Sequence, residues 1–246
     1  MNIIISPAKK MNVCNDDILP KSNPCLIDKT KVLYDILRNL SYEELQKLLE
    51  CNDEIAEVNF YRYKDMNLSS NLSPAILTYD GIQYKYMAPN TLSSDQFGYM
   101  EKHLKILSGF YGILKPFDGV TSYRLEMQAK LKSDGFKNLY DFWGNKLYEE
   151  LIKENRVILN LASKEYSKAI EKYLSDEDRF VTCIFGTLKD SKIKVKATEA
   201  KMARGLMTRF LCENFIEDLE GVKNFCDLGF TYSKEHSNDK EFVFLK

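Results

Sequence analysis

Two short, almost uninterrupted aliphatic runs place the strongest constraint on the fold of this chain. The segment NIII covers residues 2–5, and the segment RVILNLAS covers residues 156–163. Strands that are apolar on both faces are typical of the interior of a parallel or mixed sheet, and Pro7 ends the first run because proline cannot donate to a sheet ladder. We therefore predict an α/β protein with a mixed β-sheet flanked by helices.

Small and polar side chains come directly after both runs. The first is followed by Ser6, Lys9 and Lys10, and the second contains or precedes Asn160, Ser163 and Glu165. Open α/β sheets bind ligands in the crevice outside the carboxyl ends of their strands. If the two strands run in the same direction, these loops are neighbours and form a polar cleft; otherwise they are ordinary surface loops.

The rest of the chain alternates helical and strand-like patterns without an internal repeat or a Gly/Ser linker. We therefore predict a single domain over residues 1–246. The expected elements are helices within 28–66 with a Ser41/Glu44 capping box, a strand at 74–81, a helix at 93–107, a β-hairpin at 179–198 with a basic face, a helix at 199–215 and a last strand at 241–245.

Charge and composition exclude several classes of protein. The chain has 35 Lys and Arg against 36 Asp and Glu, so a site for a polyanion must be a local concentration of positive charge. Six cysteines without Cys-x-x-Cys spacing and two histidines predict no metal site, no cofactor and no histidine-based catalytic triad. No run is long enough for a membrane span or a signal peptide, so we expect a cytoplasmic protein.

The segment KMARGLMTRF, residues 201–210, predicts a helix with one basic face. At about 100° per residue, Lys201, Arg204, Gly205 and Arg209 fall on one side and the apolar residues on the other. A glycine in the middle of this face lets another backbone or a phosphate approach. The face contains no acidic residue, so it is either a solvated charged surface or a phosphate-binding surface.

Two further segments combine cations with unusual backbone signals. In LSGFYGILKP, residues 107–116, the turn glycines Gly109 and Gly112 lie between Lys105 and Lys115; they form either a phosphate-binding turn or a helix terminus.

In SYRLEM, residues 122–127, strand alternation places Arg124 and Glu126 on the same face. The pair is either a surface ion pair or an arginine held in place for a ligand phosphate.

The motifs ISPAK, LSGFYGILKPFDG with YRLEM, LYDFWG, NLASKEY and KMARGLMTRF follow one another in this order. With them the chain resembles the bacterial YaaA family of peroxide-stress proteins, from Ile4 to the terminal GFTYSKEHSNDKEFVF. The resemblance implies a cytoplasmic protein that is induced by hydrogen peroxide and lowers intracellular free iron. It also implies a mixed α/β fold with a helix-hairpin-helix-like element, a positively charged cleft that binds double-stranded or structured DNA, and no established enzymatic activity.

The resemblance and the residue patterns together define the predicted DNA-binding and phosphate-binding set. Its members are Lys9, Lys10, Lys105, Gly109, Gly112, Lys115, Arg124, Lys201, Arg204, Gly205 and Arg209, with Ser6, Glu126, Asn160, Ser163 and Glu165 as polar partners in the cleft.

We predict a non-catalytic, monomeric stress protein that binds double-stranded or branched DNA without reading its sequence. Phosphate contacts position a partner without sequence information, and no predicted helix presents base-reading Asn, Gln and Arg together. The alternative is an enzyme that acts on a nucleotide or phosphorylated substrate in the same cleft, using Lys9, Arg124 and either Glu126 or Glu165. Direct iron sequestration is a third, less favoured hypothesis.

Overall fold

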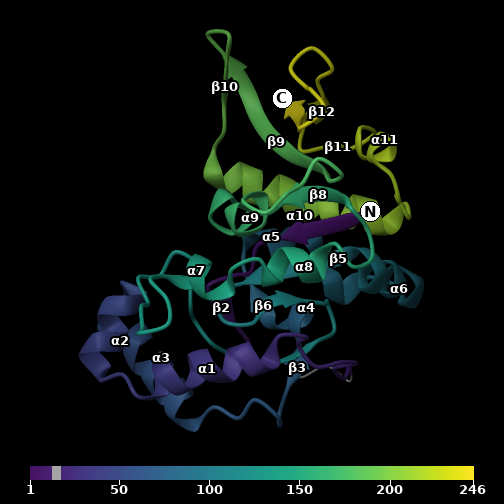
Figure 1. Ribbon diagram of the computed structural model, residues 1–246. Coiled ribbons are helices and arrows are strands. Elements are labelled where there is room, and N and C mark those ends of the chain that lie inside the picture. Colours follow the sequence, from purple (N-terminus) through teal and green to yellow (C-terminus); the bar gives the residue numbers. More distant parts are fainter. Residues whose placement is uncertain (13–17) are drawn as a thin grey trace.

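A nine-stranded mixed sheet forms the centre of the protein, which a computed structural model describes over residues 1–12 and 18–246 (Figure 1). The strand order is β11-β12-β13-β9-β8-β1-β5-β6, with β10 paired to β9. The strands are β1 (Asn2–Ile5), β5 (Leu104–Ser108), β6 (Gly112–Leu114), β8 (Val157–Leu161), β9 (Arg179–Lys189), β10 (Lys192–Lys194), β11 (Cys226–Asp227), β12 (Phe230–Tyr232) and β13 (Glu241–Leu245). The predicted mixed α/β class is confirmed.

Strand β1 lies in the parallel interior of this sheet. It pairs in parallel with β5 on one side and with β8 on the other, so that Ile4 lies opposite both Lys105 and Asn160. Both aliphatic runs are therefore neighbouring strands that run in the same direction, which is the condition under which the two loops were expected to be neighbours. The chain passes from β1 to β5 and then crosses to β8 on the other side. Such a reversal of strand order creates a ligand-binding crevice at the carboxyl edge of an open sheet.

Helices surround the sheet. They are α1 (Ile27–Arg38), α2 (Tyr42–Leu49), α3 (Asp53–Asp65), α4 (Ala75–Thr78), α5 (Ile82–Met87), the 3₁₀ helix η1 (Pro89–Thr91), α6 (Ser94–His103), α7 (Leu139–Trp143), α8 (Lys146–Leu151), α9 (Lys164–Glu171), α10 (Ala197–Glu213) and α11 (Leu219–Val222). Helices α1 to α3 gather at one end of the molecule, and the β9–β10 hairpin extends from the other (Figure 1). Helix α10 packs against α5 and α6 and contacts β9. The predicted Ser41/Glu44 capping box is present at the start of α2.

One of the predicted elements is wrong in type and another in its extent. Residues 74–81 do not form one strand, because α4 makes a helical turn in the middle of them. Two-residue strands flank this turn: β3 (Ser73–Pro74) pairs with β7 (Gly119–Val120), and β4 (Tyr79–Asp80) pairs with β2 (Lys10–Met11). The predicted helix at 93–107 ends at His103, and β5 continues the chain beside β1. Both segments are buried apolar runs, and hydrophobicity alone does not separate a buried helical turn from a buried strand.

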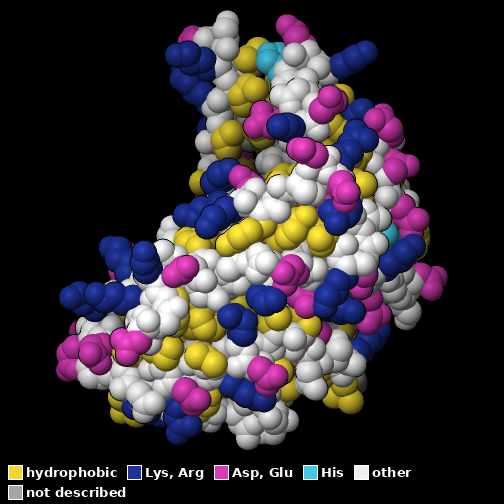
Figure 2. Space-filling model, in the orientation of Figure 1, with side chains coloured by type: hydrophobic (Ala, Val, Ile, Leu, Met, Phe, Trp, Pro, Cys, Tyr) yellow, Lys and Arg dark blue, Asp and Glu magenta, His cyan; other side chains and the backbone are white. Residues whose placement is uncertain are grey.

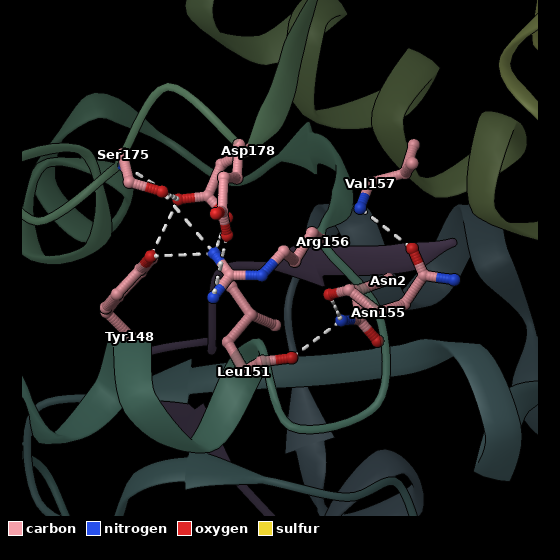
Figure 3. Close-up of polar contacts among 9 residues, drawn as sticks. Asn2, Tyr148, Leu151, Asn155, Arg156, Val157, Ser175 and Asp178 are labelled. Atoms are coloured by element: carbon pink, nitrogen blue, oxygen red, sulfur yellow. Dashed lines mark hydrogen bonds and ion pairs between the residues drawn. The ribbon is translucent and has the colours of Figure 1, made fainter.

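Polar side chains fix the opposite, amino edge of the sheet (Figure 3). The Asn2 amide donates to the carbonyl oxygens of Leu151 at 2.6 Å and Asn155 at 2.8 Å, which ties β1 to the connection between α8 and β8. Nearby, the carboxylate of Asp178 accepts hydrogen bonds from Arg156 at 2.9 Å and from Tyr148 at 2.7 Å. These contacts tie the amino ends of β1 and β9 to α8 and to the residues just before β8.

Candidate functional site

A cavity of about 330 Å³ opens where the carboxyl ends of β1 and β8 meet. The loop after β1, the start of α5, the extended segment 123–126, the start of α9 and one side of α10 form its walls. It gathers nine of the predicted site residues: Ser6, Lys9, Lys10, Arg124, Glu126, Ser163, Glu165, Lys201 and Arg204.

Two serines join the loops at the bottom of this crevice. The backbone N–H of Ser163 donates to the Ser6 hydroxyl at 2.8 Å, and the Ser6 hydroxyl donates to the Ser163 hydroxyl at 3.2 Å. The Tyr84 hydroxyl of α5 donates to the Ser6 carbonyl at 2.9 Å. Of the two alternatives for these loops, the structure shows the neighbouring arrangement, because parallel strands bring their carboxyl ends to the same edge.

Glu126 binds two of the predicted cations. Its carboxylate lies 2.9 Å from the Lys9 ammonium and 3.1 Å from the Arg124 guanidinium. Burial alone would raise the pKa of Glu126, but the hydrogen bond from Lys9 and the charge of Arg124 outweigh it and hold the pKa below its ordinary value. The proposed same-face relation of Arg124 and Glu126 is confirmed, and the two form an ion pair.

Asp80 binds two more cations and was not predicted as a site residue. It lies 2.8 Å from the Lys10 ammonium and 3.5 Å from the Lys85 ammonium. The hydrogen bond from Lys10 is the largest cause of a lowered Asp80 pKa. In the sequence, Asp80 precedes Gly81, and this pair indicates only a turn. Lys10 lies opposite Asp80 because β2 pairs with β4, and no local sequence pattern predicts that pairing.

Lys201 and Arg204 remain without a partner. No described residue forms a hydrogen bond or an ion pair with either side chain, and the Arg204 Nε atom is buried. Burial lowers the pKa of Arg204. Five cationic and three carboxylate side chains line the cavity, which gives a formal excess of two positive charges. Lys201 and Arg204 are the two cations of this set that have no carboxylate partner among the described residues.

Glu165, the third carboxylate, has no cation bound to it. It accepts a hydrogen bond from the backbone N–H of Gln128 at 3.3 Å. Burial is the largest cause of a raised Glu165 pKa, and the charge of Glu126 adds to it. Both carboxylates from which the enzymatic alternative takes one, Glu126 and Glu165, therefore line the same cavity, and Glu165 holds a proton more readily than an exposed glutamate.

Lys105 and Lys115 lie elsewhere. Their ammonium groups contact the carboxylate of Glu154 at 3.2 Å and 3.8 Å, and Lys105 is a buried residue of β5. Neither lines the cavity. The prediction that they flank a phosphate-binding turn is not supported by their position.

Gly109 lies in the turn of the β5–β6 hairpin and Gly112 is the first residue of β6, so this segment has strands where a helix-hairpin-helix element would have helices. A Cβ atom on Gly109 would meet the Leu125 carbonyl oxygen at 2.4 Å. Gly112 has φ +79° and its Cβ would meet the ring of Trp143, whose indole N–H donates to the Gly109 carbonyl at 3.0 Å. Both glycines serve close packing inside the protein.

Gly205 and Arg209 also serve packing between helices. A Cβ atom on Gly205 would lie 2.2 Å from the Gln83 carbonyl oxygen, so the approach that the glycine permits is that of helix α5. Arg209 donates to the Met87 carbonyl at 3.2 Å and lies 2.8 Å from the Glu213 carboxylate. The predicted basic face of α10 is thus divided, and only its Lys201 and Arg204 end reaches the cavity.

Asn160 lies under a neighbouring depression of about 1060 Å³ that Arg204 also lines. Its side chain is fully engaged, because Nδ2 donates to the Thr182 hydroxyl at 3.1 Å and Oδ1 accepts from the Ala162 N–H at 2.9 Å. Asn160 therefore orients the loop after β8 and does not face the first cavity.

Metal ligands do not converge in the part of the chain that is described. No group of three or more His, Cys, Asp and Glu residues there is arranged to hold a metal ion. The described cysteines are free thiols, and Cys14 lies outside the described residues. None of the described helices has the length and apolar character that crossing a membrane requires.

Cationic side chains border an indentation at one margin of the molecule (Figure 2). In that view, Lys and Arg side chains follow the left margin from the β9–β10 hairpin down to the end formed by α2 and α3, with Asp and Glu between some of them. Over the rest of the face the two signs of charge are mixed, as a net charge of −1 requires.

Comparison with known proteins gives a match over nearly the whole chain. A family model described as "Peroxide stress protein YaaA" matches residues 1–236. A UPF0246 protein of Desulfitobacterium hafniense (strain Y51) is 58% identical over 246 residues, which cover 100% of this chain and 98% of that protein. A UPF0246 protein of Lachnoclostridium phytofermentans is 54% identical over 247 residues (100% and 96%), and one of Pediococcus pentosaceus is 46% identical over 246 residues (100% and 98%).

Proposed function

Because this chain belongs to the peroxide stress protein YaaA family (UPF0246), we propose that it acts in hydrogen peroxide stress by binding double-stranded or structured DNA, and that it lowers intracellular free iron. DNA binding takes place through a positively charged cleft centred on the cavity, does not depend on base sequence and requires no catalysis. The observation that carries this proposal is the convergence of cations from distant segments in a protein whose total charge is close to zero.

The convergence joins three segments of the chain. Lys9 and Lys10 follow β1, Arg124 lies in the extended segment, and Lys201 and Arg204 come from α10. Lys9 is mostly exposed although it contacts Glu126, so its ammonium is available to a phosphate. Contacts of this kind position a nucleic acid through its backbone.

The β9–β10 hairpin supports the same partner. It extends from the body of the protein (Figure 1), and its exposed lysines are Lys189, Lys192, Lys194 and Lys196. A two-stranded β-ribbon fits the major groove of B-DNA, which is about 12 Å wide. The hairpin therefore offers a second contact to a duplex that lies across the cleft.

The test measures duplex binding by fluorescence anisotropy between about 50 and 200 mM salt, because neutralised phosphates release counterions. Replacing Lys201 by Ala is expected to weaken binding to unrelated sequences equally and to reduce the slope of log K against log salt by about 1. The Lys47→Ala variant is the matched control, since Lys47 is also an exposed helical lysine but lies away from the cavity on α2. If the wild-type protein does not bind the duplex, or if Lys201→Ala keeps its affinity and slope, the proposal is wrong.

The link to iron is tested in cells. A strain without the gene is complemented with the wild-type or the Lys201→Ala protein and exposed to hydrogen peroxide, and chelatable iron is measured by electron paramagnetic resonance. We expect the wild-type gene alone to restore low free iron. Equal restoration by a variant that no longer binds DNA would separate iron control from DNA binding and refute this part of the proposal.

A further inference from the structure

The donors left unsatisfied in the cavity indicate a specific ligand. The Arg204 Nε atom and the Gln83 Nε2 atom are buried without a hydrogen-bond partner, and Gln83 is only 7% exposed. Both residues line the cavity, where the contact between α10 and α5 brings them together. Buried donors in proteins almost always have acceptors. An acceptor-rich ligand therefore completes this wall.

The ligand is anionic. Lys9, Lys10 and Arg124 already have carboxylate partners, whereas Lys201 and Arg204 have none. A half-buried guanidinium beside an ammonium is a preferred arrangement for phosphate, because guanidinium donors match the geometry of phosphate oxygens. Gln83 is a neutral donor to the same group or to the part of the ligand attached to it.

The cavity limits the ligand to one nucleotide unit. The cavity volume of about 330 Å³ suits a small molecule, and a B-DNA duplex, which is wider than its own roughly 12 Å major groove, does not fit inside it. Apolar and aromatic side chains cover the remaining walls. The Tyr84 hydroxyl is bonded to Ser6 and the Tyr123 hydroxyl to Tyr79 and Ser108, and both side chains are buried, so only a small part of each ring reaches the cavity.

We propose that the cavity binds one phosphorylated nucleotide, with its phosphate on Lys201 and Arg204 and its base or sugar against the apolar part of the wall. The nucleotide is either free in solution or displaced from a DNA strand, in which case the inference rests on the proposed DNA-binding function. Displacing a nucleotide costs least at an end, a mismatch or an unpaired site. Only binding is proposed, and no bond is made or broken.

The first arm of the test uses a free nucleotide. Deoxyadenosine 5′-monophosphate, deoxyadenosine and inorganic phosphate are titrated into the full-length protein by calorimetry at low salt. We expect the monophosphate to bind and deoxyadenosine to bind far more weakly. Arg204→Ala is expected to reduce monophosphate affinity about 10- to 100-fold, since it removes charged hydrogen bonds. Lys201→Ala, at an exposed position that does not endanger folding, is expected to reduce it several-fold, and Lys47→Ala to leave it unchanged.

The second arm uses DNA that contains 2-aminopurine, whose fluorescence rises when the base leaves the stack. The probe is placed in the middle of a matched duplex, opposite a mismatch, or at a 5′-phosphorylated or unphosphorylated end. A rise on protein binding that is lost in Lys201→Ala, measured at protein concentrations that saturate the DNA in both cases, identifies a displaced nucleotide as the ligand. Monophosphate binding without this rise identifies a free nucleotide, and the inference stands with that source.

The inference and the proposed function fail in different ways. DNA binding that persists with neither monophosphate binding nor a 2-aminopurine signal overturns the nucleotide site and leaves DNA binding in place. Monophosphate binding by a protein that does not bind DNA overturns the proposed function and leaves the nucleotide site in place. Binding of the monophosphate that is equal in wild type, Arg204→Ala and Lys201→Ala places the ligand elsewhere and overturns the site.

Discussion

Replacing Gly205 by Ala tests whether this glycine exists for the contact between α10 and α5. Ala is about 1 kcal/mol better than Gly inside a helix. The new Cβ atom, however, would lie 2.2 Å from the Gln83 carbonyl oxygen and 3.0 Å from the Met87 backbone nitrogen. An ordinary contact begins near 3.4 Å, so α5 must move by about 1.2 Å. Overpacking of this kind costs about 1–3 kcal/mol, and the upper end applies because the atom met is rigid backbone.

The expected net result is a free energy of unfolding that is lower by about 2 kcal/mol and a Tm that is lower by about 4–8 °C. Urea unfolding followed by the fluorescence of Trp143, which is buried, measures it. Gly98→Ala is the matched control. Gly98 also lies inside a helix, α6, but nothing is within 4 Å of its Cβ position, so this variant is expected to gain up to about 1 kcal/mol. A Gly205→Ala protein at least as stable as wild type would refute the packing argument.

Two further predictions concern carboxylates. Burial tends to raise the pKa of Asp178, but hydrogen bonds from the Ser175 backbone N–H, the Tyr148 and Ser175 hydroxyls and Arg156 hold the pKa below its ordinary value. The ionised form of Asp178 therefore stabilises the fold above the unfolded pKa of about 3.9, and this contribution is lost as the pH falls through the folded pKa. Asp178→Asn is expected to lower the free energy of unfolding by about 1–3 kcal/mol at pH 7. The difference in this free energy between wild type and variant should shrink below about pH 4. Urea titrations that give the same difference at pH 7 and at pH 3 would contradict this. Burial and the charge of Glu126 raise the pKa of Glu165, with the Gln128 N–H and Lys9 opposing, so proton uptake by Glu165 as the pH falls should favour binding of deoxyadenosine monophosphate. Protonation of the phosphate, whose second pKa is about 6, acts in the opposite direction in wild type and variant alike. Glu165→Gln should bind more tightly at pH 7 and lose that part of the pH dependence in calorimetry, whereas an unchanged pH profile would show that Glu165 does not face the ligand.

The sequence predicts the centre of the fold because few structures accept an apolar run without a polar face. The runs at 2–5 and 156–163 become adjacent parallel strands, and this adjacency brings the Ser6 and Ser163 loops together. The carboxyl edge of a parallel sheet follows from strand direction alone, without any knowledge of side-chain contacts. This is why the first wall of the site was predictable.

Pairing over long distances was not predictable. Asp80 enters the site because the two-residue strands β2 and β4 pair, and Gln83 enters it because α5 packs on α10. Neither interaction leaves a periodic signal, since two residues are too few to show alternation and six too few to show a helical face. The same limit explains the error at 74–81, where one buried helical turn resembles a buried strand.

The basic face of α10 shows what a helical wheel can predict and what it cannot. The wheel places Lys201, Arg204, Gly205 and Arg209 on one side, and that is correct. A helix face 17 residues long nevertheless meets different neighbours along its length. Near its middle, Gly205 admits the backbone of α5, and one turn further Arg209 binds carbonyl groups at the end of that helix. The glycine that suggested phosphate contact is therefore what brings α5 close to α10, and this contact places the buried amide of Gln83 beside Arg204 at the cavity wall.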